Sequence, residues 1–385
     1  MSLVLVVNAG SSSLKVAVFD AGLREVLAGR VTEIGGPAAR VEVGPLVGPR
    51  PVADHATALA LVFEGMEEAG IPVAALTAAA HRVVHGGAAL VAPARVTEGL
   101  LTQVEACVPL APLHNPANLT AIRALARLAP DLPQYASFDT AFHAGMPEVA
   151  ARYALPAEAE ALGLRRYGFH GISYASLVRK VQEMAGNGVP KRLLAFHLGN
   201  GASACAILGG RSVASTMGYS PLDGLTMGTR AGGIDGNAVL RLAEVHGIAG
   251  AGRILNRESG LLGLGGASDM RALHRAGTAE ARFALAHFCY WAVRHAGSLI
   301  AAMGGLDAVA FTGGIGENDA EVRAEILRGL RFAGVEFDES ANAQGATVLH
   351  SEGAGVAVWI VAAEEERQIA MEAMQVQAAE QTGEA

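Results

Sequence analysis

The stretch NAGSSSLKVAVFD (residues 8–20) follows the apolar run LVLVV (residues 3–7) and contains a second apolar run, LKVAVF (residues 14–19). Both runs are typical of strands. Six small or polar residues, NAGSSS, separate them, whereas a tight hairpin turn needs about two. Backbone N–H groups in such a turn can bind an anion, serine hydroxyls and Lys15 add donors and positive charge, and Asn8 offers an oxygen to a hydrated Mg²⁺. The alternative is a turn that is merely rich in serine.

The same plan returns in RLLAFHLGNGASACAILGGRSV (residues 192–213), which also joins two apolar runs through a small polar turn. Strand-like and helix-like segments alternate along both halves of the chain, which predicts an α/β fold. We therefore expect an internal repeat of two similar domains that face one another across a ligand-binding cleft. Two unrelated hairpins are the alternative. The chain should end in a strand, an acidic junction and a helix, with a frayed tail after about Val376.

Composition excludes several classes of protein. The chain has 385 residues, is 51% hydrophobic and carries a net charge of −8. The sequence has no stripe of basic residues that would indicate nucleic acid as a partner. The most apolar long segment, residues 285–305, contains three His or Arg residues and indicates a buried helix, so no membrane partner is expected. The first residues do not resemble a signal peptide, and the three separated cysteines indicate core thiols. We expect a cytoplasmic protein.

Two further turns are rich in glycine. HLGNGAS (residues 197–203) is the turn of the second hairpin, and TGGIGEN (residues 312–318) joins a predicted strand to a helix. Glycine lets the backbone approach a ligand closely, and the start of a helix favours anions. One such turn is weak evidence, but several in one chain favour a nucleotide whose phosphates lie between two domains.

Charged and imidazole side chains also occur in unusual settings. Arg82 and Arg230 stand among glycine and apolar residues, where a guanidinium can bind carboxylate or phosphate; a structural ion pair is the alternative for each. Asp139 ends a short predicted strand, and its alternative is a helix N-cap. Histidines in similarly suggestive contexts are His114, His143, His170 and His197.

Eight motifs then occur in a fixed order: NAGSSSLK, HRVVHGG, APLHNP, FDTAFH, YGFHG, HLGNG, MGTR and FTGGIGEN. From about residue 3 to 372 the sequence resembles the acetate kinases, within the acetate and sugar kinase/Hsp70/actin superfamily. The resemblance implies two duplicated ribonuclease-H-like domains, residues 1–138 with 367–385 on the acyl-substrate side and residues 139–366 on the nucleotide side. It also implies a homodimer and reversible phosphoryl transfer between ATP and acetate, which gives ADP and acetyl phosphate.

The same resemblance implies roles for particular residues. Asp139, His170 and Arg230 are the catalytic candidates, and Asn8 and Glu365 would hold Mg²⁺ or Mn²⁺. The carboxylic acid would contact Arg82, Val84, Leu113, Phe169 and Pro221, and His114 would lie nearby. ATP would contact Ser11, Ser13, Lys15, His197, Leu198, Gly199, Asn200, Gly201, Asp269, Met270, Arg271, Gly314, Ile315, Gly316, Glu317 and Asn318.

The sequence departs from the family pattern at two of these places. The family commonly has Asn before the metal-binding Glu, where this chain has Glu364. Both Glu364 and Glu365 therefore remain candidates for the metal ligand. The family also commonly has an aromatic residue in a Ser-Asp-Phe-Arg segment, where this chain has Met270, which weakens the assignment of this segment to the adenine pocket.

The chemistry itself constrains these roles. A carboxylate acceptor is already ionised at neutral pH, so it needs no general base, and the main barrier is repulsion between two anions. Positioned arginine, histidine and a divalent cation relieve that repulsion. We therefore expect Asp139 to orient a cationic group, against the family role of proton donor and acceptor. The alternatives are a propionate or butyrate kinase, a sugar kinase that would use Asp139 as a base, and a chaperone of the Hsp70 type, for which no peptide-binding region is left.

Overall fold

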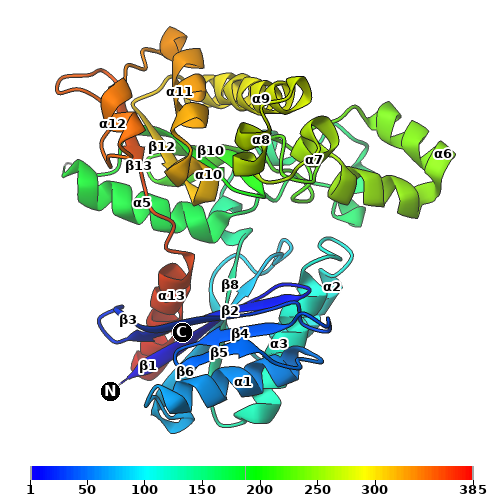
Figure 1. Ribbon diagram of the computed structural model, residues 1–385, viewed down its shortest axis with the longest axis vertical. Coiled ribbons are helices and arrows are strands. Elements are labelled where there is room, and N and C mark those ends of the chain that lie inside the picture. Colours follow the sequence, from blue (N-terminus) through cyan, green and yellow to red (C-terminus); the bar gives the residue numbers. More distant parts are fainter. Residues whose placement is uncertain (1, 187, 384–385) are drawn as a thin grey trace. The chain divides into compact units, whose positions relative to one another are not determined.

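The computed structural model describes residues 2–186 and 188–383, and the chain forms two compact units (Figure 1). The first unit consists of Met1–Phe142 and Glu364–Ala385, and the second unit consists of His143–Ala363. The change of unit after Phe142 differs from the boundaries expected from the sequence. Asp139 and Glu365 consequently both belong to the first unit.

The first unit is built on a mixed sheet with the strand order β5-β4-β3-β2-β1-β6-β8-β7. Its strands are β1 (Leu3–Ala9), β2 (Ser13–Asp20), β3 (Glu25–Thr32), β4 (Arg40–Val43), β5 (Leu46–Pro49), β6 (Leu76–Val83), β7 (Ala94–Arg95) and β8 (Gln134–Phe138). Its main helices are α1 (His55–Glu68), α2 (Glu98–Ala106), α3 (Asn115–Leu128) and α13 (Glu365–Thr382).

The opening stretch forms the centre of this sheet. β1 and β2 pair antiparallel around the serine-rich turn, while β1 and β6, and then β6 and β8, pair in parallel. Leu3, Leu5 and Val7 join a core with buried residues of α1 and α3. Side chains alternate along a strand, so Val4 and Val6 point to the other face, and α13 packs against β1, β6 and β8. Because β1 is covered on both faces, it is apolar at nearly every position.

The second unit repeats this plan with the strand order β11-β10-β9-β12-β13. Its strands are β9 (Arg192–Leu198), β10 (Ala202–Leu208), β11 (Arg211–Ser215), β12 (Ala308–Thr312) and β13 (Ala357–Ile360). As in the order β3-β2-β1-β6-β8, the first three strands are antiparallel and the next two are added in parallel. The predicted α/β repeat is confirmed.

Helices surround the second sheet and carry its long loops. They are α4 (Glu148–Ala151), α5 (Gly171–Ala185), α6 (Gly236–Arg253), α7 (Gly260–Gly265), α8 (Met270–Ala276), α9 (Ala279–Met303), α10 (Gly313–Asn318), α11 (Ala320–Gly329) and α12 (Glu339–Ala343). The apolar segment from residue 285 lies in α9, which packs on β9, β10 and β11. Of the helices in the described residues, none combines the length and apolar character that crossing a bilayer requires.

One expectation about the end of the chain is wrong. The predicted fraying after Val376 does not occur, since α13 continues to Thr382. The Gln377 side chain donates to the carbonyl oxygen of Thr77 at 3.2 Å, and the Tyr135 hydroxyl donates to Glu380 at 2.9 Å. These polar residues therefore bind strands β6 and β8 of the sheet instead of facing only water.

The cysteine prediction is confirmed. Cys107, Cys205 and Cys289 are all buried with free thiols. Burial raises the pKa of the Cys205 thiol, and likewise that of Cys289, to about 12. Both thiols therefore stay protonated at neutral pH and serve as core side chains.

Candidate active site

An arginine–carboxylate pair lies at the end of the parallel strands of the first unit. Arg82 lies near the end of β6, and Asp139 directly follows β8. The Arg82 Nε is 3.1 Å from Oδ1 of Asp139, and its terminal nitrogen NH2 is 2.7 Å from Oδ2. Asp139 is only 2% exposed. This two-pronged contact fixes the guanidinium plane and uses both carboxylate oxygens.

The acidic junction at the start of α13 adds negative charge beside this pair. Glu365 lies 3.8 Å from Arg82, and Glu366 lies 2.6 Å from the ammonium of Lys15. Burial alone would lower the pKa of Arg82, but the charges of Asp139 and Glu365 outweigh it and raise that pKa above its usual value. Glu364 faces Arg367 at 3.2 Å instead. Three carboxylates around Arg82 and Lys15 leave a surplus of negative charge.

The serine-rich turn lies at the surface of the same unit. Ser11, Ser12 and Ser13 are exposed, and the turn is closed by the N–H of Gly10, which donates to the carbonyl oxygen of Ser13 at 2.8 Å. Buried His55 binds the carbonyl oxygen of Gly10 at 2.8 Å and ties the turn to α1. Sequence reasoning gave His55 no role, because it lies at a helix start with no motif around it.

Asn8 lies at the end of β1, directly opposite Lys15 of β2. Asn8 and the acidic junction are therefore connected through Lys15, which reaches Glu366. Among the described residues, no cluster of three or more His, Cys, Asp or Glu side chains is placed to hold a metal. A cation at Asn8 and Glu365 would thus take most of its ligands from water or from a substrate, as Mg²⁺ usually does.

In the second unit two histidine rings and an arginine come together. The rings of His170 and His197 are stacked with centroids 4.1 Å apart. A Cβ atom placed on Gly201 would lie 3.3 Å from Nε2 of His170 and 3.7 Å from NH1 of Arg230. Arg230 also donates from NH1 to the carbonyl oxygen of Pro221 at 2.8 Å. Glycine at position 201 therefore leaves open the space that His170 and Arg230 share.

The backbone at His170 is in the left-handed region, with φ of 58°. This conformation is uncommon for a residue with a side chain and occurs often at functional sites. Behind it, His143 binds Ser212 at 2.8 Å and the carbonyl oxygen of Phe169 at 2.9 Å. Burial lowers the pKa of His143 to about 4. The histidine of FDTAFH, which its motif made a site candidate, is therefore a neutral core residue that supports the loop of His170.

A cavity of about 710 Å³ lies between loops and helices of the second unit. Residues from three separate predicted motifs line it: Gly199, Asn200, Asp269, Met270, Arg271, Gly314, Ile315 and Asn318. The Asp269 carboxylate caps α8 and binds Arg271 at 2.7 Å. Its bond with Arg271 lowers the pKa of Asp269 to about 2. The carboxylate is thus ionised and engaged in the cavity wall.

Other predicted nucleotide contacts lie outside this cavity lining. Leu198 is buried at the end of β9. Gly316 is buried against Phe311. The Glu317 carboxylate accepts the backbone N–H groups of Gly313 and Ala363, each at 3.0 Å, so it stabilises the start of α10. His197 and Gly201 belong to the neighbouring histidine–arginine cluster.

Sequence reasoning missed part of the cavity wall. His274, Arg275, Asp319 and Glu321 also line it. His274 Nε2 lies 2.9 Å from Asp319, whose other carboxylate oxygen accepts the Val322 N–H at the start of α11. His274 and Arg275 lie in α8 and Glu321 in α11, on ordinary amphipathic helices, whereas Asp319 directly follows the TGGIGEN motif and caps α11. Their only signal was polar character on one face of α8 and α11.

The residues predicted for the acyl pocket divide between the units. In the first unit Val84 is buried, and its backbone N–H donates to the Asn118 side chain at 3.2 Å. Leu113 is 41% exposed, and the next residue, His114, is the N-cap of α3. In the second unit Phe169 is 1% exposed, and Pro221 provides the carbonyl oxygen that Arg230 binds.

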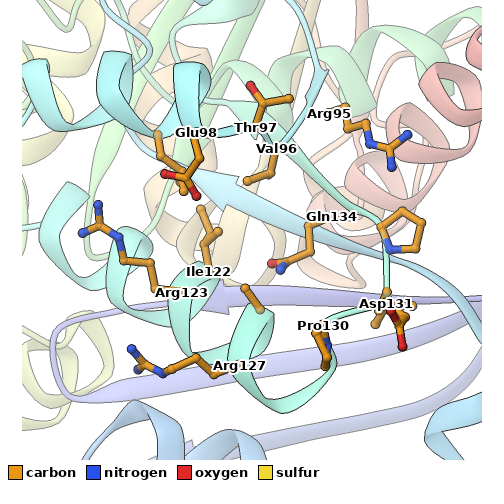
Figure 2. A pocket seen from close by; sticks show the side chains of 14 residues that line it. Arg95, Val96, Thr97, Glu98, Ile122, Arg123, Arg127, Pro130, Asp131 and Gln134 are labelled. Carbon is orange, nitrogen blue, oxygen red and sulfur yellow. The ribbon is translucent and has the colours of Figure 1, made fainter.

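Besides the cavity of the second unit, a hollow of about 410 Å³ lies in the first unit, and Figure 2 shows it. Arg95, Glu98, Arg123, Arg127 and Gln134 are among its lining residues, which come from β7, α2, α3 and the start of β8. The predicted site residues do not include any member of this lining. Arg123 pairs with Glu105 and Arg95 with Glu380, which is a sufficient structural reason for two of its charges.

Comparison with known proteins supports the resemblance seen in the motifs. An acetate kinase from Streptomyces avermitilis is 43% identical over 389 residues, which cover 96% of each chain. The crystal structure of an acetate kinase from Porphyromonas gingivalis is 34% identical with a TM-score of 0.89 and covers 98% of this chain and 100% of that chain.

A propionate kinase from Francisella tularensis has the same fold. Its crystal structure is 33% identical with a TM-score of 0.92, and the match covers 97% of this chain and 99% of that chain. The sequence model of the acetokinase family matches residues 3–371 of this chain. Because this match spans both units and all eight motifs, the chain belongs to the acetokinase family.

Proposed function

We propose that this protein is an acetate kinase, which transfers the γ-phosphoryl group of ATP to acetate and gives acetyl phosphate and ADP in a reversible reaction. The observation that carries the proposal is the nearly full-length similarity to acetate kinases, at 43% identity for the Streptomyces avermitilis protein. The residue assignments below rest on the motifs and on the contacts described above.

The arginines would supply most of the positive charge that offsets the repulsion between the two anionic substrates. Acetate is already an anion, so the reaction needs a way to bring it to the negatively charged γ-phosphoryl group. We assign Arg82 and Arg230 to this task, with His170 as a further donor to the charge that develops. Asp139 keeps the Arg82 guanidinium in one orientation through two oxygens, which supports the role of a positioning residue instead of a base.

The second unit would bind ATP. Its cavity of about 710 Å³ joins the HLGNG turn, the start of α8 and the start of α10, and a helix start with glycine turns suits phosphates. Met270 is buried, so it can pack against a flat base where the family commonly has an aromatic ring. Lys15, Ser11 and Ser13 of the first unit are exposed donors for the phosphates.

A magnesium ion would bind at Asn8 and Glu365. The surplus negative charge around Arg82 and Lys15 suits a cation, and amide and carboxylate oxygens are the ligands that Mg²⁺ prefers. Glu365 is the better candidate than Glu364, because Glu364 is already neutralised by Arg367. When bound, the ion would neutralise charge on the phosphates.

The acyl group would contact Val84, Leu113, Phe169 and Pro221, and the apolar nature of these residues argues against a sugar as acceptor. A second candidate function is propionate kinase, because the propionate kinase from Francisella tularensis has the same fold at 33% identity. One methylene group changes specificity by only about 1–3 kcal/mol, so both acids should be accepted to different degrees. We favour acetate because the buried Val84 leaves little room.

The test is a hydroxylamine assay for acyl phosphate with ATP, Mg²⁺ and, in separate reactions, acetate, propionate, butyrate and glucose. We expect acyl hydroxamate with acetate at the highest kcat/KM, less with propionate, and no ADP release above background with glucose. Higher kcat/KM for propionate would assign the second function. Phosphorylation of glucose without hydroxamate would contradict both.

We extend the proposal to a homodimer in the cytoplasm, which rests on the family resemblance alone. Light scattering after size exclusion at micromolar concentration should give twice the mass of one chain, 39.4 kDa. A monomer that is fully active would contradict the dimer without affecting the proposed reaction.

A further inference from the structure

A chain of two buried hydroxyl groups, from Tyr174 to Ser203, ends at the imidazole of His170. Ser203 Oγ lies 2.9 Å from Nδ1 of His170, and the hydroxyl oxygen of Tyr174 lies 2.6 Å from Ser203 Oγ. Ser203 and Tyr174 are both 0% exposed. Tyr174 is one helical turn after His170 in α5, whereas Ser203 comes from β10, so strand and helix meet at this ring.

The order of donors and acceptors follows from the demand that buried polar groups find partners. The phenol of Tyr174 is a more acidic O–H group than the alcohol of Ser203, so in the 2.6 Å contact between them the Tyr174 proton goes to Ser203. Ser203 then has its proton left for the Nδ1 atom of His170. A histidine that accepts at Nδ1 carries its proton on Nε2 when neutral.

The Nε2 atom is the one that faces the open space of the site. A Cβ atom on Gly201 would come within 3.3 Å of Nε2 and 3.7 Å of NH1 of Arg230. An N–H group at Nε2 and the guanidinium of Arg230 would therefore point donors at one place. Nδ1, in contrast, faces the interior of the unit.

His197 supports the same ring from its flat side. Its own Nδ1 is held by Ser173 at 2.8 Å, and the two rings stack at an angle of 28°. His197 and Ser203 are direct partners in the β9–β10 ladder. The His170 ring is thus restrained at its edge by a hydroxyl and at its face by a second ring.

We propose that Tyr174 and Ser203 are positioning residues, which fix the His170 ring and keep it in the tautomer with the proton on Nε2. This N–H then donates to the phosphoryl group during transfer. The second statement rests on the proposed function, whereas the tautomer and its dependence on the two hydroxyls do not.

The experiment combines ¹⁵N NMR of the histidine side chains with steady-state kinetics on the full chain. His170→Gln identifies the His170 signals. In the unsubstituted protein at pH 8 we expect a protonated Nε2 and an unprotonated Nδ1. Ser203→Ala and Tyr174→Phe should each shift the populations toward the other tautomer. Each should lower kcat about 10-fold, with little change in the KM of ATP or acetate.

Ser176→Ala is the matched control. Ser176 lies on the same helix and is buried, and its hydroxyl has no hydrogen-bond partner within the part of the chain that is described. This variant should keep both kcat and the tautomer. Because both changes interrupt one chain of hydroxyls, Ser203→Ala combined with Tyr174→Phe should lower kcat by much less than the product of the single effects.

Two outcomes would overturn the proposal: a proton on Nδ1 of His170 in the unsubstituted protein, or single variants that behave like Ser176→Ala. If Ser203→Ala does not fold, Tyr174→Phe carries the test, because it keeps the buried ring. If acetyl phosphate is not made but the tautomer responds as expected, the proposed function fails and the positioning role stands.

Discussion

At the scale of single residues, the account depends on what Asp139 does. Its two oxygens both bind Arg82, and it is 2% exposed. A carboxylate engaged in this way is a poor base, because protonation would break a charged contact made in the folded state. We therefore interpret Arg82 and Asp139 as one unit, in which the carboxylate determines the direction of the guanidinium.

Asp139→Asn should lower kcat on the order of 100-fold, as expected when a donor to the reacting group is misplaced. Because the effect comes from geometry, the loss should be the same across the pH range of the assay. The measurement is a pH–rate profile of both proteins between pH 5 and 9. An acidic limb that is present in the unsubstituted enzyme and absent in Asp139→Asn would restore proton transfer at Asp139.

The metal site makes a second residue-scale prediction. Glu365→Ala should raise the Mg²⁺ concentration needed for half-maximal rate by about 10-fold or more, since Glu365 lies beside Arg82 in the site whereas Glu364 pairs with Arg367. Glu364→Ala is the matched control and should change that concentration little. A larger effect of Glu364→Ala would exchange the roles of the two residues.

A third prediction concerns stability and His143. Its pKa is 6.5 as an unperturbed group and about 4 in the fold, because burial disfavours the charged ring. As the pH falls, this side chain is therefore protonated at a higher pH in the unfolded chain than in the folded chain. The contribution of the neutral ring to the free energy of unfolding is complete above pH 6.5 and is lost as the pH falls toward 4. Between pH 7 and pH 5, the protonation of this residue in the unfolded chain should lower the free energy of unfolding by about 2 kcal/mol.

Denaturant unfolding at both pH values checks this. His143→Gln should be less stable at pH 7, because it loses the contact with Ser212 or with Phe169, but its stability should fall less between pH 7 and 5. His246→Gln, at an exposed position, should keep the full pH dependence. An unchanged dependence in His143→Gln would show that its ring is charged or exposed in the fold.

At the scale of elements, the sequence predicts the repeated strands and helices but misses polar contacts between residues that are far apart in the chain. The hairpins around NAGSSS and HLGNG, the strand DAVAF and the helix after TGGIGEN are all present, because apolar periodicity and glycine turns are local signals. The end of α13 was missed because its polar residues bind Thr77 and Tyr135, which are far away in sequence. The Glu317 carboxylate likewise binds two backbone N–H groups, one of them on the distant Ala363, which no local pattern predicts.

The loops around the nucleotide cavity also make a prediction. The Gly228 N–H donates to the carbonyl oxygen of Asn200 at 2.9 Å, and a Cβ atom at Gly228 would lie 1.9 Å from the Asn200 side-chain oxygen. Gly228→Ala must therefore displace Asn200. We expect weaker ATP binding by about 10-fold or more in calorimetry, with the far-ultraviolet circular dichroism unchanged.

Gly236→Ala provides the control for this change. Gly236 begins α6, and a Cβ atom there would have no atom within 4 Å apart from its neighbours in the chain. Its ATP affinity should equal that of the unsubstituted protein. Equal affinity in Gly228→Ala would mean that Asn200 does not contact the nucleotide.

At the scale of the whole molecule, the duplication is the main result. Both units share the same run of five strands, β3-β2-β1-β6-β8 in the first and β11-β10-β9-β12-β13 in the second, in which two parallel strands follow three antiparallel ones. This repeat was predictable because each half opens with the same hairpin plan. The cavity wall was predictable only in part. Residues such as His274 and Asp319 reach it through tertiary packing of α8 and α11, which no local pattern encodes.

The central claim is that the carboxylate of acetate attacks the γ-phosphoryl group of ATP. The most direct measurement is ³¹P NMR of the product formed from ATP, Mg²⁺ and acetate labelled with ¹⁸O in both carboxylate oxygens. We predict acetyl phosphate whose phosphorus signal shows the shift caused by one bonded ¹⁸O atom. The same label should then be found in inorganic phosphate after cleavage of the C–O bond. An acetyl phosphate signal without the isotope shift, or ADP and unlabelled phosphate with no acetyl phosphate, would contradict the account.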